Sequence, residues 1–291
     1  MNRILVTGAT GNVGKEVVKS LLNLTNNDTI VAGVRNADGD DHSFKWPEDP
    51  RLRLQHFDFE DPGTFKPALA QCDILFLLRP PQLSDVKKTF KPLIRVAREC
   101  QVKHIVFLSV QGVQNSPMIP HYKIEKIIVR SEIPYTFLRP AYFMQNFTTT
   151  LLKDLVEKKT IFLPAGDAKF TIIDTADIGL VSAVVLTSPG GHINKSYELT
   201  NAEKLNFREM TARISSVLGS QIKYVSPSPL SFFIQKRKEK VPAMFILVMI
   251  MLHYFPRFSR EPETTECVFQ LTGKPPTTFN EFLEIHKHLL I

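Results

Sequence analysis

The chain has 291 residues, of which 43% are hydrophobic and 22% are charged, and its formal net charge is +7. This composition excludes a disordered, collagen-like or coiled-coil chain, and the length allows one large domain or two smaller ones. The positive charge is scattered, and its densest cluster, Lys236-Arg237-Lys238 with Lys240, is typical of a solvated helix face. Because no nucleic-acid-binding motif accompanies the charge, we expect no nucleic-acid partner.

Strand and helix signals alternate through the first half of the chain. Short apolar runs predict strands at residues 3–6, 29–34, 52–57, 73–78, 104–108 and 135–138. Helices are predicted between them at residues 13–24, 84–100 and 120–131. This alternation is typical of a Rossmann-like, doubly wound α/β fold, in which helices cover both faces of a parallel sheet.

The alternation breaks after Pro140. Short strands are predicted at residues 170–173, 195–199 and 222–225, and helices at 177–186, 207–218, 229–240 and after Pro242. We therefore expect a Rossmann-like domain over residues 1–150 and a smaller α+β, substrate-facing subdomain over residues 151–291. Segments near residues 170–190 are expected to return to the sheet.

Cysteine usage and hydropathy bear on the compartment. Cys72, Cys100 and Cys267 are odd in number and far apart, which predicts neither a disulfide framework nor a metal site and favours a reducing, cytoplasmic environment. The N-terminus runs directly into a short strand, so we expect no signal peptide. The longest apolar stretch, residues 243–255, is shorter than the roughly 20 residues that a membrane span needs. It predicts a buried or lid helix, with contact at a membrane surface as the alternative.

A glycine-rich turn joins the first predicted strand to the first helix. Residues 7–14 read Thr-Gly-Ala-Thr-Gly-Asn-Val-Gly, so a glycine recurs at every third position. In dinucleotide-binding folds such glycines form the tight turn, admit the pyrophosphate to the main chain and let the helix pack on the strand. A turn without a ligand is the weaker alternative, because a strand precedes the turn and a helix follows it. The predicted dinucleotide contacts are Gly8, Thr10, Gly11, Asn12, Val13 and Gly14.

The end of the second predicted strand indicates which dinucleotide binds. Arg35 stands about where folds that bind NAD carry an acid for the ribose hydroxyls. A guanidinium suits a 2′-phosphate, whereas a carboxylate would repel one. NADP, as NADPH, is therefore the predicted cofactor and NAD the less favoured one; the alternative is that Arg35 only caps a strand edge.

The spacing Gly-x-x-Gly-x-x-Gly resembles that of the short-chain dehydrogenase/reductase superfamily. This resemblance implies that Asp58, with Phe59, lies at the adenine and accepts a hydrogen bond from its amino group; a simple turn aspartate is the alternative. Leu78 and Arg79 end the fourth strand, where the main chain passes under the adenosine ribose in the superfamily. Arg79 is either a phosphate contact or an unusually charged loop residue.

The superfamily's catalytic tyrosine–lysine pair has a match that we interpret as false. Tyr122 and Lys126 have the right spacing, but helical geometry places them roughly opposite Ile124 and Ile128, on a solvent face. Residues 131–140, Ser-Glu-Ile-Pro-Tyr-Thr-Phe-Leu-Arg-Pro, closely resemble a segment of the NmrA-like family of atypical reductases.

Segments 173–178 and 271–279 resemble two further elements of that family. The family includes quinone oxidoreductases, triphenylmethane-dye reductases and NADP-sensing regulators. Counting back from residues 131–140, Glu125 matches the family's helix glutamate, and His121 takes the superfamily's lysine position. The superfamily's tyrosine position falls on Pro117, so the general-acid tyrosine is expected to be missing.

The resemblance also implies a second group of site residues. His121 either bonds the nicotinamide ribose, relays a proton or has no role. Ser109 ends the fifth strand, where the superfamily places a substrate-polarising hydroxyl. The loop after the sixth strand, which contains Tyr142 and Phe143, resembles the loop that lines the nicotinamide in the family. The alternative is that these two aromatic residues only pack in the core. The expected catalytic residues are His121, Ser109 and Tyr142, and the expected cofactor contacts of this group are His121, Phe143 and Asn146.

These expectations point to hydride transfer from NADPH to a small apolar or aromatic substrate. A simple ketone needs an acid for the nascent alkoxide, whereas a quinone, a dye or an imine-like acceptor delocalises the incoming electrons. The alternative is a non-catalytic NADP(H)-binding redox sensor that acts through a protein partner. The histidines lack metal-ligand spacing, so no metal is expected. Six aromatic residues either line the substrate site or belong to the core: Phe232, Phe233, Phe245, Tyr254, Phe255 and Phe258.

Overall fold

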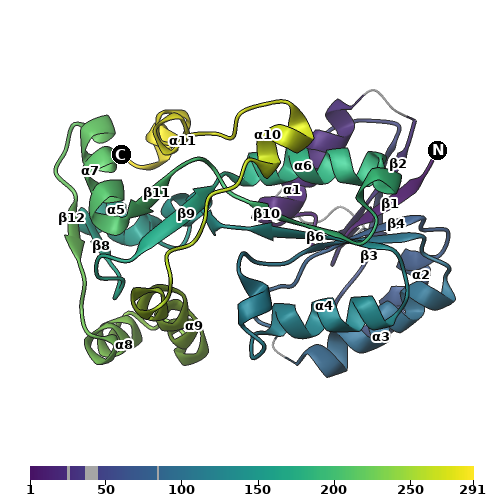
Figure 1. The fold of residues 1–291 in the computed structure, drawn as a ribbon, viewed down its shortest axis with the longest axis horizontal. Coiled ribbons are helices and arrows are strands. Elements are labelled where there is room, and N and C mark those ends of the chain that lie inside the picture. The colour runs from purple at the N-terminus through teal and green to yellow at the C-terminus, as the bar shows by residue number, and fades with distance from the viewer. Residues whose placement is uncertain (25–26, 37–44, 84) are drawn as a thin grey trace. The chain divides into compact units, whose positions relative to one another are not determined.

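The computed structural model describes residues 1–24, 27–36, 45–83 and 85–291, and the chain divides into two units (Figure 1). The first unit comprises Met1–Pro140, Thr175–Leu199 and Cys267–Lys274, and the second comprises Ala141–Asp174, Thr200–Glu266 and Pro275–Ile291. The expected boundary at residue 150 is thus later than the observed one, which follows Pro140. Of the segments expected to return to the sheet, residues 170–173 stay in the second unit, whereas residues 175–199 belong to the first.

A seven-stranded sheet forms the centre of the first unit. Its order is β10-β6-β5-β4-β1-β2-β3, and every neighbouring pair is parallel. The strands are β1 (Arg3–Val6), β2 (Thr29–Val34), β3 (Leu52–His56), β4 (Ile74–Leu77), β5 (His104–Leu108), β6 (Tyr135–Pro140) and β10 (Lys195–Leu199). This confirms the predicted Rossmann-like α/β fold. The prediction placed residues 195–199 in the second domain; they instead extend this sheet beside β6.

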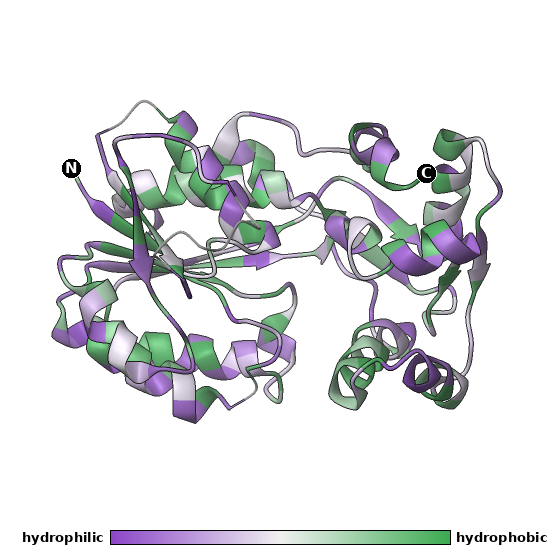
Figure 2. Cartoon of the chain, turned by 180° about the vertical axis from the view of Figure 1, so that it is seen from behind, coloured by the Kyte–Doolittle hydropathy of each residue, from purple (hydrophilic) through white to green (hydrophobic). Residues whose placement is uncertain are grey.

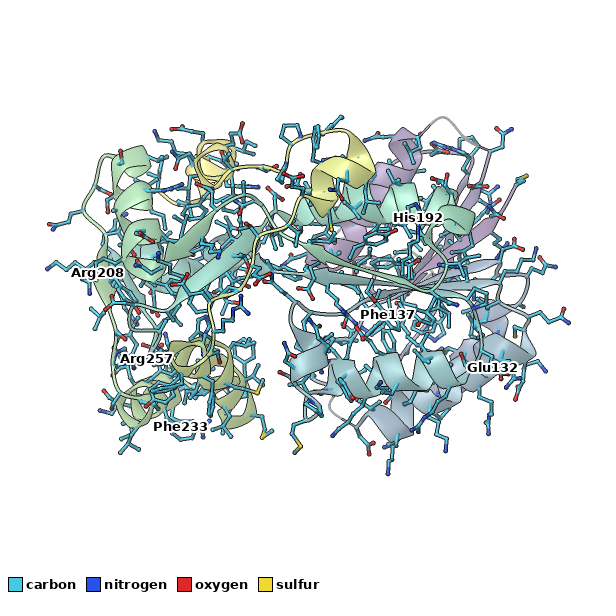
Figure 3. The ribbon with its side chains drawn as sticks, viewed as in Figure 1. Glu132, Phe137, His192, Arg208, Phe233 and Arg257 are labelled. Carbon is cyan, nitrogen blue, oxygen red and sulfur yellow. The ribbon has the colours of Figure 1, made fainter. Side chains whose placement is uncertain are left out.

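Helices cover both faces of this sheet (Figure 1). One layer holds α1 (Asn12–Asn23), α6 (Thr175–Thr187) and α10 (Cys267–Thr272), and the other holds α2 (Phe65–Leu69), α3 (Val86–Glu99) and α4 (Pro120–Arg130). The apolar stripe of α3 is buried, and Phe137 of β6 lies between the sheet and α4 (Figure 3). The predicted start of the helix observed as α3, Ser84, lies outside the described residues. The helix begins after Asp85, whose side chain accepts from the Lys88 N–H at 3.0 Å.

The second unit has two small sheets and its own apolar core. The sheets are β11-β9-β7 and β12-β8, and the core gathers aromatic side chains such as Phe147, Phe207 and Phe279. The strands are β7 (Tyr142–Phe143), β8 (Thr160–Phe162), β9 (Lys169–Ile173), β11 (Lys204–Asn206) and β12 (Lys223–Val225). The helices are α5 (Leu152–Lys158), α7 (Phe207–Leu218), α8 (Pro229–Lys238), α9 (Ala243–Tyr254) and α11 (Phe279–His286).

Lys236 corrects the expectation of a solvated basic face. Its ammonium group is buried against Asp154 and also contacts the Glu239 carboxylate at 2.8 Å. Only Arg237 and Lys238 of the triplet are exposed. The sequence suggests a solvated cluster because the main partner of Lys236, Asp154 on α5, lies far from it along the chain.

Helix α9 is also not the buried helix that its composition suggests. Ile246, Met249 and His253 face the core, whereas the opposite side, with Leu247 and Met251, is exposed. Figure 2 shows α9 as an apolar helix beside the more hydrophilic α8. Among the aromatic residues expected to line a site or the core, Phe232 is fully buried and Phe258 is 71% exposed. In the described part of the chain, no helix has the length and apolar character that crossing a bilayer requires.

Candidate functional site

The turn between β1 and α1 has a geometry that only glycine allows. Gly8 has a φ of +60°, and a Cβ on it would lie 2.8 Å from the Leu78 side chain. A Cβ on Gly14 would lie 2.1 Å from the Gly8 carbonyl oxygen, so the first turn of α1 packs directly on the loop. The Gly11 N–H closes the turn by donating to the Gly8 carbonyl at 3.0 Å. The glycine spacing is therefore required by packing.

The N-terminus of α1 presents main-chain N–H groups that no side chain caps. Gly11 occupies the capping position, and the first helical turn contains no acidic residue. Thr10, Gly11 and Asn12 are exposed around it, whereas the Val13 side chain is buried and leaves only its main chain for a ligand. Free N–H groups and the positive end of the helix dipole together suit a phosphate. The turn thus fits the diphosphate of a dinucleotide.

Thr7 holds the neighbouring strand end against this turn. Its buried hydroxyl donates to the Phe76 carbonyl at 3.0 Å and accepts from the Leu78 N–H at 3.2 Å. These two hydrogen bonds fix Leu78 beside Gly8. The sequence predicts that both residues contact the cofactor. Thr7 was not among the predicted site residues, because a threonine before a glycine turn has no distinctive spacing.

Arg35 and Asp58 lie at the carboxyl ends of neighbouring strands β2 and β3. Arg35 is exposed and forms no ion pair with any residue that the structure describes. The Asp58 carboxylate accepts from the Glu60 N–H at 2.9 Å, which is the turn role considered as its alternative. The Phe59 ring packs edge-on against Phe57 with centroids 4.9 Å apart. A cofactor at Phe59 would therefore meet its main chain.

Buried polar groups without partners gather at the carboxyl edge of β4 and β5. Three buried side-chain nitrogen or oxygen atoms find no hydrogen-bond partner among the described residues, and two of them are Arg79 Nε and Ser109 Oγ. Arg79 Nη1 donates to three loop carbonyls, those of Pro80, Pro81 and Leu83, and burial lowers the pKa of its guanidinium. Because unsatisfied buried groups are costly, this edge suits a ligand that offers acceptors.

His121 stands at the start of α4 near the same edge. Burial, and secondly the charge of Arg79, lower its pKa to about 3. Its ring lies beside Phe107, with centroids 6.1 Å apart. His121 is therefore neutral at ordinary pH, so one ring nitrogen donates a hydrogen bond and the other accepts one, and the ring carries no charge for catalysis.

Tyr122 and Lys126 occupy the outer side of α4. The Lys126 ammonium is exposed and lies over the Tyr122 ring, 5.3 Å from its centroid. Ile124 and Ile128 on the same helix are fully buried. This is the arrangement that helical periodicity predicts.

Glu125, the third residue singled out on α4, has a structural partner. Arg139 on β6 donates to both of its carboxylate oxygens, at 3.0 and 2.8 Å. Glu198 of β10 lies 4.0 Å from the same guanidinium and also accepts from the Gly112 N–H. The three charges tie α4 to two strands and thereby set the position of His121.

The second unit contributes a separate polar group built on Tyr142. The Tyr142 hydroxyl lies 3.2 Å from His253 Nε2, and His253 Nδ1 lies 2.6 Å from the Met249 carbonyl oxygen. A carbonyl only accepts, so Nδ1 carries the hydrogen and Nε2 accepts the phenolic hydrogen. Burial raises the pKa of Tyr142, a shift that a hydrogen bond from Asn146 partly opposes. Burial also lowers the pKa of His253 to about 4, so both groups are neutral.

His253 is a site candidate that the sequence interpretation missed. It lies in the apolar helix α9, 111 residues from Tyr142, and no motif marks it. Phe143, by contrast, is partly buried next to Tyr142, and nothing in the described structure gives its ring a specific partner. Among the described residues, no group of acidic, cysteine or histidine side chains has the arrangement of a metal site.

A surface cavity of about 630 Å³ lies elsewhere in the second unit. Side chains of α5, β8 and α8 line it, including Asp154, Lys158 and Glu239. These charges pair with one another, at 2.7 Å for Lys158 with Asp154 and 2.6 Å for Lys158 with Glu239. None of the predicted site residues lines this cavity, so we do not assign it to the chemistry.

The chain is similar to known proteins over nearly its whole length. The model of the NmrA-like family matches residues 1–283. The prestalk A differentiation protein A of Dictyostelium discoideum is 30% identical, with 96% of this chain and 90% of that protein covered. An NAD(P)H azoreductase of Xenophilus azovorans is 27% identical, and the match covers 97% of each protein.

A solved structure agrees over nearly the whole length. The triphenylmethane reductase of Citrobacter sp., complexed with NADP(H), superimposes with a TM-score of 0.84 at 26% identity and covers 97% of this chain and 99% of its own. The family resemblance of residues 131–140 is therefore confirmed. The chain belongs to the NmrA-like family.

Proposed function

We propose that this protein is an NADPH-dependent reductase that transfers hydride to a conjugated or aromatic acceptor such as a quinone, a dye or an imine-like compound. The single observation that carries the proposal is the uncapped N-terminus of α1 behind a turn that only glycine can form. Relatives named as reductases, one of them complexed with NADP(H), support the same activity.

The cofactor would lie along the carboxyl edge of β1, β2 and β4. Main-chain N–H groups from Gly8 to Gly14 would hold its diphosphate, and Arg35 would bond the 2′-phosphate that distinguishes NADP from NAD. Asp58 has one carboxylate oxygen engaged in its turn and would offer the other to the adenine amino group. Ser109 Oγ and Arg79 Nε, which lack partners in the described chain, would gain them near the ribose.

NADPH supplies the hydride when bound, so the residues have to orient the acceptor and manage the proton. His121 is neutral and cannot act as a strong acid, and Tyr122 lies on the outer side of α4. A nascent alkoxide would thus lack the usual acid, whereas the reduced form of a quinone or dye spreads its charge over a conjugated system. We therefore assign the acceptor to the conjugated class. His121, Ser109 and Tyr142 are the proposed catalytic residues.

The test is NADPH consumption by the purified protein with quinones, triphenylmethane and azo dyes, and simple ketones. We expect turnover of the conjugated acceptors, little turnover of ketones, and unchanged rates in the Tyr122→Phe variant. Ketone reduction that Tyr122→Phe abolishes would overturn the acceptor assignment. NADPH binding without turnover of any acceptor would instead favour a redox sensor that acts through a protein partner.

A further inference from the structure

Half of the large hydrophobic side chains that the described chain exposes lie in one short stretch. This stretch, residues 229–260, contains α8, α9 and the 3₁₀ turn η5 (Phe255–Phe258). Nine of the eighteen such side chains belong to it: Leu230, Ile234, Met244, Phe245, Leu247, Met251, Leu252, Phe255 and Phe258. Single exposed hydrophobic residues are ordinary, but a concentration of this kind marks an interaction surface.

Helix α9 provides the largest part of this surface. Its sequence, Ala-Met-Phe-Ile-Leu-Val-Met-Ile-Met-Leu-His-Tyr, contains no residue that is charged at neutral pH. Met244, Leu247 and Met251 are spaced by three and four residues and thus share one side, where they are 70%, 49% and 41% exposed. Within the described part of the second unit, nothing covers this apolar side of the helix. We call it the α9 face.

Positive charge surrounds the α9 face. Residues 229–260 contain six lysines and arginines and one acid, Glu239, which gives a local net charge of +5 out of the +7 of the whole chain. Glu239 is already paired with Lys158 and Lys236. Arg260 pairs with Glu263 at 2.8 Å, which leaves exposed cations without a carboxylate partner among the described residues, at Arg237, Lys238, Lys240 and Arg257.

These cations lie near both ends of α9. Arg237 Nη1 donates to the Val241 carbonyl at 2.9 Å, in the turn that leads into the helix. The Arg257 guanidinium lies over the Tyr254 ring, 5.1 Å from its centroid, at the other end (Figure 3). The surface thus combines an uncharged apolar helix with flanking positive charge.

We propose that the α9 face docks on an anionic lipid bilayer, with the helix lying in the plane of the interface. Apolar side chains would enter the boundary between headgroups and acyl chains, and Arg237, Lys238, Lys240 and Arg257 would meet the anionic headgroups. A helix of 12 residues is about 18 Å long, too short to span a bilayer but suited to lie in its surface. A second copy of the chain fits poorly, because it would bring two sets of cations together.

Vesicle flotation of the full-length protein tests this docking. We expect binding to vesicles of phosphatidylcholine with phosphatidylglycerol, little binding to phosphatidylcholine alone, and release as salt is raised. The Leu247→Ser/Met251→Ser variant should weaken binding by at least about tenfold. The Arg237→Gln/Lys238→Gln/Lys240→Gln variant should also weaken it at least about tenfold, and only on anionic vesicles.

Matched variants elsewhere on the surface provide the controls. Val129→Ser/Ile285→Ser removes two apolar side chains of similar exposure, 44% and 62%, and should leave flotation unchanged. Lys87→Gln/Lys88→Gln/Lys91→Gln on α3 removes three exposed cations and should change flotation much less than the Arg237→Gln/Lys238→Gln/Lys240→Gln variant. Urea unfolding of each variant separates lost docking from lost folding.

Three outcomes would overturn the proposal. The first is wild-type protein that binds no anionic vesicle, and the second is a Leu247→Ser/Met251→Ser variant that is folded and binds as well as the wild type. The third is a dimer or an acidic protein complex that needs Leu247 and Met251 while vesicles fail to bind. Equal binding to neutral and anionic vesicles would show that the cations do not contribute to docking.

Discussion

Arg139 on β6 and Glu125 on α4, the helix that carries His121, form a bidentate ion pair. Both hydrogen bonds are short, 3.0 and 2.8 Å, and the two side chains are 15% and 8% exposed. Arg139 stands in the family-like segment 131–140, and Glu125 matches the family's helix glutamate. Their ion pair holds α4 against the sheet.

Removing one partner of this pair should be strongly destabilising. Arg139→Met leaves the Glu125 charge buried without its partner, so the free energy of unfolding should fall by about 3–5 kcal/mol. Urea unfolding followed by circular dichroism measures the change. Arg98→Met, which breaks the exposed pair with Glu132, serves as the control and should cost less than about 1 kcal/mol. Equal losses in the two variants would contradict the structural role of the buried pair.

Arg35 should determine which dinucleotide binds. Arg35→Ala removes a charge-assisted hydrogen bond to the 2′-phosphate, so the Kd for NADPH should rise about 10- to 100-fold while the Kd for NADH stays nearly constant. Calorimetric titration measures both constants. Arg53→Ala alters another exposed arginine, near the start of β3, and should change neither. If Arg35→Ala left the NADPH affinity unchanged, Arg35 would only cap the edge of a strand and would not bind the 2′-phosphate.

Gly14 should be irreplaceable for packing reasons. A Cβ at this position would lie 2.1 Å from the Gly8 carbonyl oxygen, so Gly14→Ala must displace α1 from the turn. We expect a loss of about 1–3 kcal/mol in stability and clearly weaker dinucleotide binding, because the N–H groups no longer converge. Gly190→Ala is the control, since nothing lies within 4 Å of its added Cβ. A Gly14→Ala protein with normal affinity would show that the turn does not hold the diphosphate.

The parts of the fold that sequence predicts well are those with local signals. The buried strands β1, β4 and β5 are short apolar runs, and the glycine turn marks where the first helix begins. The strand β10 could be located but not placed, because its pairing with β6 is a contact across more than fifty residues of sequence. The sequence of β10, Lys-Ser-Tyr-Glu-Leu, mixes polar and apolar residues. Such a sequence does not distinguish a strand at the edge of a large sheet from a strand of a small separate sheet.

The candidate site follows the same division. The turn at Gly8 and the tyrosine–lysine match on α4, which we interpret as false, depend on spacing within one segment, so sequence could address both. His253 could not be predicted, because its role depends on a contact with Tyr142 from a distant helix. Likewise, Lys236 looks solvated until the Asp154 carboxylate on α5 is placed against it.

Stability should fall in acid because burial keeps three histidines, His104, His121 and His253, in the neutral form. Burial lowers the pKa of His104 and of His253 to about 4, below the ordinary value near 6.5. Above about pH 6.5 neither state binds these protons, so the full stability is present. As the pH falls from about 6.5 to about 4, the unfolded chain binds protons that the folded chain refuses, and each histidine lowers stability by up to about 1.4 kcal/mol per pH unit.

Urea unfolding across this pH range measures the slope. His104 Nε2 contacts the Thr136 hydroxyl at 2.9 Å, a bond that a glutamine can partly reproduce without titrating. His104→Gln should therefore make the dependence on pH shallower, even if it lowers stability at neutral pH. A slope that the substitution does not change would mean that His104 does not control the acid response.

The Tyr142–His253 pair should affect turnover without affecting cofactor binding. Because His253 Nε2 accepts the phenolic hydrogen, His253 sets the direction of the Tyr142 hydroxyl, and Tyr142 is the proposed catalytic partner of the acceptor. Tyr142→Phe should lower kcat about 10- to 100-fold with a quinone while the Kd for NADPH stays unchanged. His253→Gln, whose amide can still accept from the phenol, should retain more activity than His253→Leu. Tyr135→Phe, at the start of β6, is the control and should leave kcat unchanged. If Tyr142→Phe matched the wild-type kcat, the pair would be a core contact of the second unit, and Tyr142 would have no part in orienting the acceptor.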